Sequence, residues 1–414
     1  MLNVVVFQAN GPPFSANIQD AVIVSFARTP IGKFLGGLSS LPGPELGAQA
    51  IKAALSRCGD HADVAALVEE AYMGNVISAG IGQAPARQAV IRAGLAETVA
   101  CTTVNKVCAS GMKAVALAAQ SVWLGQREVV LAGGFESMSN VPYYLPKARA
   151  GYRIGNGEVV DGVIKDGLWD AKHDMHMGMC AEACAETFGF SREAQDDYAV
   201  ESYRRAAAAW GAGKFDAEVA PVSVPQRRGD PIVVTRDEEF INIDLKKLRT
   251  LRPAFKPEGG TVTAANASTL NDGAAALVVM SAARAAALGL TPLARIRGVA
   301  DAERAHVEFT VAPADAIPLA LKHAGVEKAD VGYWEINEAF SVVALANAKL
   351  LSLDPARLNV NGGGVALGHP IGMSGARLVG SIIHVLRQND SDVGCAAICN
   401  GGGGASAIVI ERLS

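Results

Sequence analysis

Two cysteines and a histidine lie in stretches of small residues in this 414-residue chain. Cys108 precedes the run Gly111 to Trp123, which is rich in helix formers and contains no proline, so we expect Cys108 at or just before a helix N-terminus. The helix dipole favours an anion there and can lower the pKa of a thiol enough to supply a thiolate at neutral pH. The position predicts a nucleophile, although a lone cysteine among small residues also fits a buried structural thiol.

The histidine and the second cysteine lie near the other end of the chain. His369 stands in a loop too rich in glycine for regular structure, directly before a helical run from 376 to 386. Cys399 ends a short apolar run and is followed by four glycines, 401–404, whose N–H groups can form an anion-binding nest. Two thiols, an imidazole and exposed amides are the groups that acyl transfer requires.

Composition narrows the class of protein. Hydrophobic residues make up 50% of the chain and charged residues 19%, with a net charge of -4, which is typical of a globular enzyme and argues against nucleic acid as a partner. The chain contains no run of about 18 strongly apolar residues, so no membrane span is predicted. Residues 1–27 contain no Lys or Arg, so neither a signal peptide nor an Arg-rich transit peptide is indicated. Seven dispersed cysteines indicate free thiols in a reducing compartment, so we expect a cytoplasmic protein.

Strand and helix patterns alternate along the chain, which predicts a parallel sheet with helices on its faces. The first set of elements comprises strands at 21–26, 68–77 and 129–134 and helices at 45–58, 84–93 and 111–123. A similar order returns after residue 292, with strands at 292–300, 331–337 and 395–399 and helices at 317–324 and 372–386. The core is therefore predicted to consist of two related halves whose helix N-termini face one another.

The region between these sets has a different texture. Residues 139–263 hold much of the Pro-, Arg- and Asp-rich sequence and lack the strand–helix rhythm, so we interpret them as a loop domain that covers the site. The predicted boundaries are 19–138 with 264–286 for the first half, 139–263 for the loop domain and 287–414 for the second half. Residues 1–18 show no period and are predicted to be a short extended or disordered leader.

Five motifs in order give the chain a strong resemblance to the thiolases, in particular to the acetoacetyl-CoA type. They are Asn105–Ala114, Gly133–Asn140, Asn337–Phe340, Gly368–Arg377 and Cys399–Ala407. The resemblance implies two repeated βαβαβαββ halves in a five-layered α/β/α/β/α arrangement. It also implies a homotetramer of lipid metabolism that joins two acetyl-CoA into acetoacetyl-CoA and CoA through an S-acetyl-cysteine. Coenzyme A is then a substrate, and no tightly bound cofactor is expected.

The resemblance implies a role for each catalytic residue. Cys108 would accept the acyl group, and His369 would take its proton. Cys399 would act as the second acid/base on the methyl carbon of the second acetyl group. The amides of Cys108 and Gly401 would stabilise the tetrahedral oxyanion, and Asn337 would support an oxyanion hole through a water, although it also fits a helix N-cap.

Ligand contacts are implied in the same way. Tyr203, Lys247 and Ser268 match coenzyme A contacts, although Lys247 also fits a solvated surface and Tyr203 a packed helix residue. The acyl pocket would be lined by His176, Met177, Phe309 and Phe340. A potassium site would use Tyr203, Ala264, Ala265, Ala267 and Val365. Thr310 stands where the family has proline, which leaves open whether Phe309 lines the pocket or only packs the loop.

Three alternatives stand beside this interpretation. A broader 3-ketoacyl-CoA thiolase of fatty-acid β-oxidation would use the same chemistry with a wider pocket. A ketoacyl or hydroxymethylglutaryl-CoA synthase would share the fold but would not place a catalytic cysteine before Asn-Gly-Gly-Gly-Gly. A non-catalytic acyl-CoA binder would not need Cys108, His369 and Cys399 together.

Overall fold

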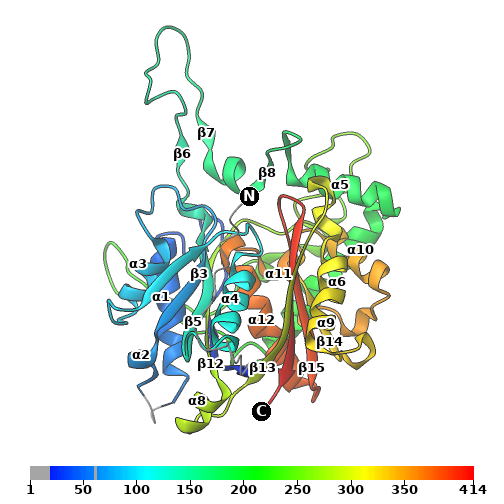
Figure 1. The fold of residues 1–414 in the computed structure, drawn as a ribbon. Helices are drawn as coiled ribbons and strands as arrows, with labels where there is room; N and C mark the ends of the chain where they lie inside the picture. The colour runs from blue at the N-terminus through cyan, green and yellow to red at the C-terminus, as the bar shows by residue number, and fades with distance from the viewer. Residues whose placement is uncertain (1–18, 60–62) are drawn as a thin grey trace, which may run out of the picture.

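A computed structural model describes residues 19–59 and 63–414, so the predicted leader lies outside the described residues. Within them a ten-stranded sheet runs through the molecule (Figure 1). Its strands, in spatial order, are β14 (Tyr333–Ile336), β15 (Val393–Asn400), β16 (Gly404–Arg412), β13 (Ala294–Glu303), β1 (Ala21–Arg28), β12 (Asn271–Ser281), β5 (Val129–Ser137), β3 (Glu70–Gly74) and β4 (Ala100–Val104), with β2 (Gly32–Lys33) beside β12.

The strand order shows the predicted repeat. The series β1-β12-β5-β3-β4 corresponds to β13-β16-β15-β14, and a bridge from Trp334 to Leu358 lies where the second series continues. The two series join through a short pairing of β1 with β13. The expectation of a parallel sheet is wrong, because among the strand pairs of the described residues only β3–β4, β3–β5 and β14–β15 are parallel. β16 returns from β15 in a tight hairpin, and the two strands of a tight hairpin are necessarily antiparallel. β12, which follows the insertion, is likewise antiparallel to β5.

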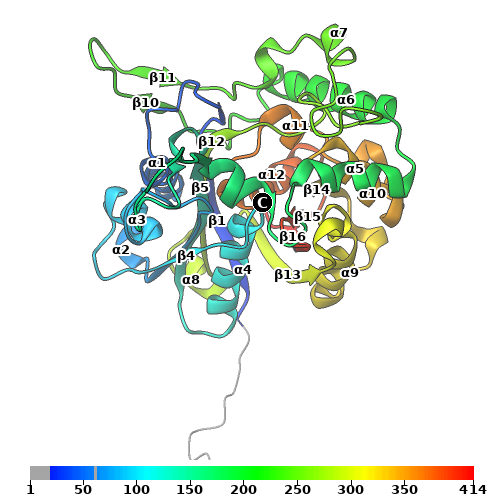
Figure 2. The ribbon, with the colours of Figure 1, turned by 90° about the horizontal axis from the view of Figure 1, so that it is seen from above.

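Two helices form the middle layer between the halves. α4 (Ser110–Trp123) and α12 (Ile371–Gln388) pack against each other and against strands of both series, as the view from above shows (Figure 2). The outer faces are covered by α1 (Gly43–Ser56) and α3 (Pro85–Arg92) on one side and by α9 (Pro313–Ala324) with α10 (Ser341–Leu351) on the other. The result is the five-layered arrangement that the family resemblance implies.

α12 is covered on every side, whereas α4 keeps a partly buried stripe that includes Lys113 and Gln120. Every residue of α12 from Ile371 to Leu386 is buried, and the ring of Phe26 fills the space that a side chain at Gly380 would need. The buried stretch also contains Arg377, whose guanidinium lies 3.7 Å from a carboxylate oxygen of Glu335. Across the described part of the chain, no helix has both the length and the hydropathy to cross a membrane.

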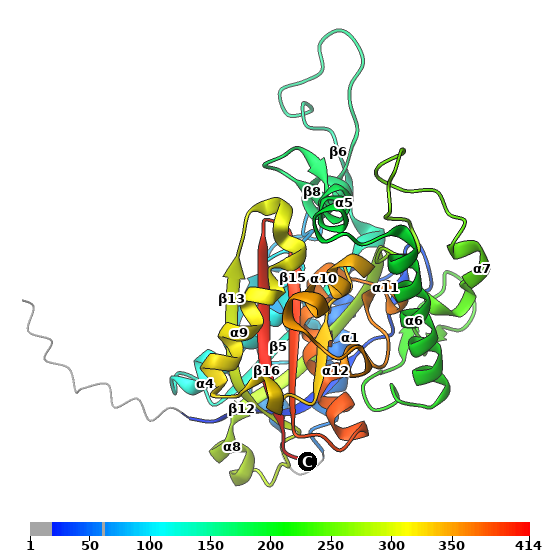
Figure 3. The same cartoon turned by 90° about the vertical axis from the view of Figure 1, so that its right-hand side faces the viewer.

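The insertion between the two halves contains regular structure that sequence periodicity did not indicate. An arm carrying β6 (Tyr143–Tyr144) and β7 (Val160–Asp161) projects from the body (Figure 1). Beyond it, α5 (Met177–Phe188) and the twenty-residue α6 (Arg192–Gly211) pack against α10 and α11 (Gly364–Leu367), as Figure 3 shows. α5 and α6 follow one another without a strand between them, and polar residues and alanines obscure the apolar face of α6 in the sequence.

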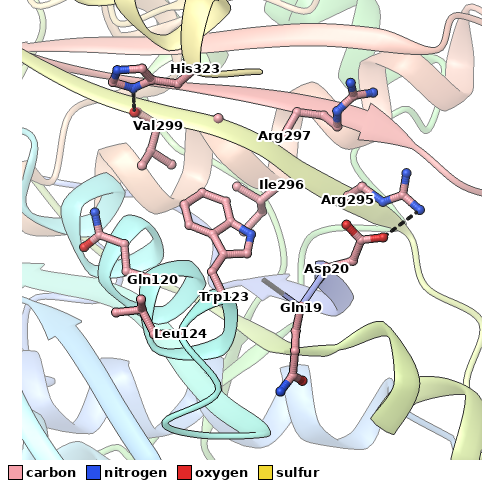
Figure 4. A pocket seen from close by; sticks show the side chains of 11 residues that line it. Gln19, Asp20, Gln120, Trp123, Leu124, Arg295, Ile296, Arg297, Val299 and His323 are labelled. Carbon is pink, nitrogen blue, oxygen red and sulfur yellow. Dashed lines mark hydrogen bonds and ion pairs between the residues drawn. The ribbon is translucent and has the colours of Figure 1, made fainter. Parts of the chain in front are cut away.

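A hollow of about 850 Å³ opens at the carboxyl end of α4, between that helix and β13 (Figure 4). Trp123 and Ile296 line it. Arg295 pairs with Asp20 at 3.2 Å and also with Glu411 at 3.2 Å. The charges of this wall are therefore neutralised locally, and the hollow lies at the opposite end of α4 from Cys108.

Candidate active site

The first turns of α4 and α12 approach so closely that their backbones nearly touch. A Cβ atom on Gly111 would lie 2.8 Å from the nitrogen of Ala376, and one on Gly74, at the end of β3, would lie 2.6 Å from the nitrogen of Gly111. A side chain would not fit at either position, so glycine is required for close approach. This contact brings together the loops that carry Cys108 and His369.

The loop before α4 is strained at Val107 and held by hydrogen bonds on either side of Cys108. Val107 has φ of 46°, a left-handed conformation that is uncommon for a β-branched residue. The side-chain oxygen of Asn105 accepts from the Val107 N–H at 3.0 Å, and the Ser110 hydroxyl donates to the Val107 carbonyl at 2.6 Å. The sulfur of Cys108 is thereby presented to a cavity, two residues before the first residue of α4.

The pKa of Cys108 is not lowered, contrary to the sequence-based expectation. Burial raises the pKa of Cys108 to about 11, although the N–H groups of Gly401 and of Cys108 itself act to lower it. The dipole of α4 and these amides therefore do not offset the loss of solvent around the thiolate. Cys108 is a thiol at neutral pH and needs a base when it reacts.

His369 is suited to be that base. Its side chain is nearly buried, and burial, with the positive charge of Arg377, lowers the pKa of His369 to about 3. The Ser374 hydroxyl donates to the Pro370 carbonyl at 3.0 Å, so it accepts from Nδ1–H of His369, which lies 2.6 Å away. This assignment leaves Nε2 unprotonated, as the acceptor of a long hydrogen bond from the amide nitrogen of Asn337 at 3.4 Å, and its lone pair can take a proton when that bond is given up.

Cys399 lies at the end of β15 and is fully buried. Burial, together with the negative charge that Cys108 would carry as a thiolate, holds the pKa of Cys399 well above its usual range. Its sulfur does not line the cavity, whereas Gly401, two residues later, does. Cys399 is therefore a protonated thiol close to Cys108 and shielded from bulk water.

Cys108, His369 and Gly401 share one cavity of about 610 Å³. Ring stacking fixes one wall, because His176 lies against Phe255 with ring centroids 4.6 Å apart, and the His176 Nδ1 accepts from the Gly178 N–H at 3.0 Å. The other predicted residues that line the cavity are Met177, Ala264, Ala267, Ser268, Phe309 and Phe340. The walls are mostly apolar, which fits an acyl chain and a pantetheine arm.

The remaining predicted residues lie outside the cavity lining. Asn337 is buried behind His369. Tyr203 lies in α6 and is 4% exposed, in the same core cluster as Ala265 and Val365. Lys247 lies on α7 (Leu245–Leu248), where its side chain is 81% exposed and its nitrogen lies 3.9 Å from an Asp244 oxygen.

Several residues of the site were not predicted from the sequence, and Phe255, Glu239 and Glu136 are among them. Phe255 and Glu239 line the cavity but stand in irregular segments of the insertion where no pattern marks them. Glu136 belongs to the quoted run Gly133–Asn140 and is buried at the end of β5. A charged residue within an otherwise uncharged buried strand was the available signal for Glu136.

Comparison with known proteins identifies the family. Sequence models of the thiolase N-terminal and C-terminal domains match residues 21–283 and 290–412. Acetyl-CoA acetyltransferase 2 of Arabidopsis thaliana is 56% identical over 96% of this chain and 98% of its own length. A cytosolic acetyl-CoA acetyltransferase of Gibberella zeae is 54% identical over 96% of this chain and 100% of its own, and a mitochondrial one of Xenopus laevis is 55% identical over 96% and 93%.

The fold agrees with these relatives. The crystal structure of Acat5 thiolase from Ascaris suum in complex with coenzyme A superposes with a TM-score of 0.90 and 46% identity, covering 95% of this chain and all of that one. Both domain models together span almost all of the described residues. The chain belongs to the thiolase family.

Proposed function

We propose that this chain is an acetyl-CoA C-acetyltransferase, which reversibly condenses two acetyl-CoA into acetoacetyl-CoA and CoA. The observation that carries the proposal is the single cavity in which the Cys108 thiol meets the imidazole of His369 and the amide of Gly401. The names of the relatives support it over a broader 3-ketoacyl-CoA thiolase. Mass spectrometry after incubation with acetyl-CoA should find one acetyl group on Cys108; an unmodified Cys108 would exclude this function.

The cleavage direction shows how the residues act. The Cys108 proton passes to Nε2 of His369, and the sulfur attacks the 3-keto carbon of acetoacetyl-CoA. The amides of Cys108 and Gly401 stabilise the oxyanion. The bond between carbons 2 and 3 breaks, the released carbanion takes the proton of Cys399 to give acetyl-CoA, and the His369 proton returns to Cys399. CoA then attacks the acetyl-Cys108 thioester, and its proton ends on Cys108.

The insertion supplies the walls that would select substrates. We infer that 139–263 acts as a domain over the site, since His176, Met177 and Phe255 line the cavity from it. Tyr203, Lys247 and Ser268 are proposed to contact coenzyme A, with Ser268 in the cavity and Lys247 outside it. A chain-length series of 3-ketoacyl-CoA substrates tests this. Acetoacetyl-CoA should be cleaved fastest, and a better six-carbon substrate would favour the broader thiolase.

A potassium ion fits the residues that the family resemblance implies. Tyr203 is buried, and after burial itself, the carboxylates of Glu239 and Glu338 raise its pKa, which indicates a negative potential around the hydroxyl. Ala264 and Ala265 lie in a turn closed by the Ala267 N–H bonded to the Thr263 carbonyl at 3.1 Å. Carbonyl oxygens suit hard cations. Activity should be higher in potassium than in sodium chloride at equal ionic strength; equal rates would exclude activation.

The projecting arm is proposed to support a homotetramer. Tyr143 is 65% exposed and Ile154 is fully exposed, which is unusual for large apolar side chains that remain in water. Sedimentation should report four chains for the native protein and fewer for Ile154→Asp; a native monomer would contradict the proposal.

We propose the cytoplasm as the compartment. The seven cysteines are all free in the structure, and one relative is named as cytosolic. Fractionation of cells that produce the full chain, with marker enzymes for each compartment, tests this.

A further inference from the structure

Glu136 is a buried carboxylate at the carboxyl end of β5 to which the acyl-transfer chemistry assigns no role. It is 1% exposed, and its partners are neutral N–H groups from two separate segments of the chain, 75–77 and the start of α12. Burying an ionisable group costs free energy unless hydrogen bonds satisfy its polar atoms. The segments that it joins are therefore informative.

Four donors converge on the two oxygens of Glu136. The side-chain amide of Asn75 donates at 2.9 Å, and the backbone N–H groups of Val76 and Ile77 donate at 3.0 and 3.2 Å. The N–H of Gly372 donates from the first turn of α12 at 3.0 Å. One carboxylate thus ties the loop after β3 to the amino end of a helix in the other half of the fold.

Each side of this contact leads to a catalytic residue. The Val76 carbonyl accepts from the side-chain amide of Asn105 at 3.2 Å, and the oxygen of Asn105 holds the Val107 N–H next to Cys108. On the other side, α12 begins two residues after His369. The path from Glu136 to either catalytic side chain therefore consists of short hydrogen bonds and backbone.

We propose that Glu136 is a positioning residue of the acyl-transfer site, which sets the place of the Cys108 loop against the helix that follows His369. This proposal rests on the function proposed above. The carboxylate also has an electrical effect, because its negative charge opposes formation of the Cys108 thiolate. The titratable groups that face it are Cys108, from the loop before α4, and Asp272, from β12.

The charge on Glu136 is itself variable near neutral pH. Burial, followed by repulsion from Asp272, raises the pKa of Glu136 to about 7, although the N–H groups of Val76, Ile77 and Gly372 act to lower it. Asp272 is held in turn by the hydroxyl groups of Ser137 and Ser139. Above neutral pH, where thiol reactivity rises, Glu136 carries its full charge.

Two substitutions of Glu136 separate the effect of its charge from the effect of its side-chain length. Glu136→Gln keeps the shape and removes the charge, whereas Glu136→Asp keeps the charge and shortens the side chain. Glu218→Gln is the matched control, because Glu218 is equally buried but bonds to Arg28 and Ser381. The measurements are kcat and KM for acetoacetyl-CoA cleavage and the pH dependence of Cys108 alkylation by iodoacetamide, located by peptide mass spectrometry, with circular dichroism to monitor folding.

We expect both Glu136 variants to lose about tenfold or more in kcat with KM changed little, since displacing a catalytic group by about 1 Å costs up to about 100-fold. The alkylation midpoint should fall by about one pH unit in Glu136→Gln only, because one like charge is gone. Folded variants with native kcat, or a loss of kcat in Glu136→Gln without that shift, would overturn the proposal. If Glu136→Gln does not fold, native kcat in Glu136→Asp overturns it. Absence of acetylation in the native protein would instead refute the proposed function.

Discussion

The starts of α4 and α12 occupy corresponding places in the two halves of the fold, but they present different chemistry. The loop before α4 turns through Val107, with φ of 46°, and leaves the Cys108 thiol partly exposed to the cavity. The loop before α12 turns through Gly368, with φ of 104°, and leaves His369 only 5% exposed, with one ring nitrogen occupied by Ser374.

In the mechanism proposed above, this difference means that a duplicated scaffold supplies both partners of the proton transfer. Burial raises the pKa of Cys108 and lowers that of His369, so both groups are neutral before substrate binds. In the free protein Cys108 and His369 therefore do not form a thiolate–imidazolium ion pair. Charge is expected to form only when the thiol attacks, where the amides of Cys108 and Gly401 can stabilise the oxyanion.

The largest effect is expected from Cys108→Ala, which removes the chemistry of the α4 start. Acetylation should be abolished, and cleavage of acetoacetyl-CoA should fall by about four orders of magnitude or more, because no other group forms the covalent intermediate. Intact-mass spectrometry after incubation with acetyl-CoA measures this. Cys101→Ala, a partly exposed cysteine of β4, is the control and should remain acetylated. Acetyl on Cys108→Ala protein would contradict the assignment.

Cys399→Ala should separate acylation from carbon–carbon chemistry. The variant keeps both helix starts, so Cys108 should still be acetylated, whereas condensation and cleavage should fall by about 10²–10⁴-fold, the usual contribution of a general acid or base. Cys395→Ala provides a matched control, because Cys395 is buried in the same strand but packs into a different core cluster. Near-native cleavage by Cys399→Ala would remove this residue from the mechanism.

Ser374→Ala tests the α12 start more gently. Without the hydroxyl, Nδ1–H of His369 loses its acceptor, so the ring can rotate or change tautomer, and kcat should fall by about 10- to 100-fold. Steady-state kinetics across pH measure the loss. Ser381→Ala, on the same helix but bonded to Glu218, should retain native kcat. Equal rates for the two variants would show that Ser374 does not orient the base.

Sequence patterns predicted where these groups lie in the fold, but they did not predict what surrounds each group. The small-residue stretches around Cys108, His369 and Cys399 marked two helix starts and a strand end, and the strand order confirms the repeat. The family and its fold followed from the five motifs. Local patterns carry this information because helix starts and glycine turns are local structures.

Other features depended on residues distant in sequence. The raised pKa of Cys108 results from burial under the insertion and the second half, which no local signal reports. The antiparallel course of β12 depends on how the chain returns after the insertion. The contacts of Glu136 join segments 75–77 and 372, which only the folded chain brings together.

The smallest effect is expected from a change in the cavity lining at Phe309 rather than at the starts of α4 and α12. Phe309 is 2% exposed, lines the cavity and packs with Met177 and Phe340, so both earlier interpretations of this residue fit the structure. The Thr310 carbonyl, where the family has proline, accepts from the Asn347 side chain at 2.8 Å and secures the segment. A methyl group in an apolar pocket changes binding by about 1–3 kcal/mol.

We therefore expect 2-methylacetoacetyl-CoA to be cleaved at a rate within about tenfold of acetoacetyl-CoA, since about 1.4 kcal/mol corresponds to that factor. Phe309→Ala should change this ratio while Cys108 acetylation by acetyl-CoA stays native, because the wall contacts the substrate and neither helix start. The straight six-carbon 3-ketoacyl-CoA should remain poor in the native protein, since His176 and Met177 lie in the cavity wall. A good six-carbon rate with no cleavage of the branched substrate would mean that the wall is shaped for long chains.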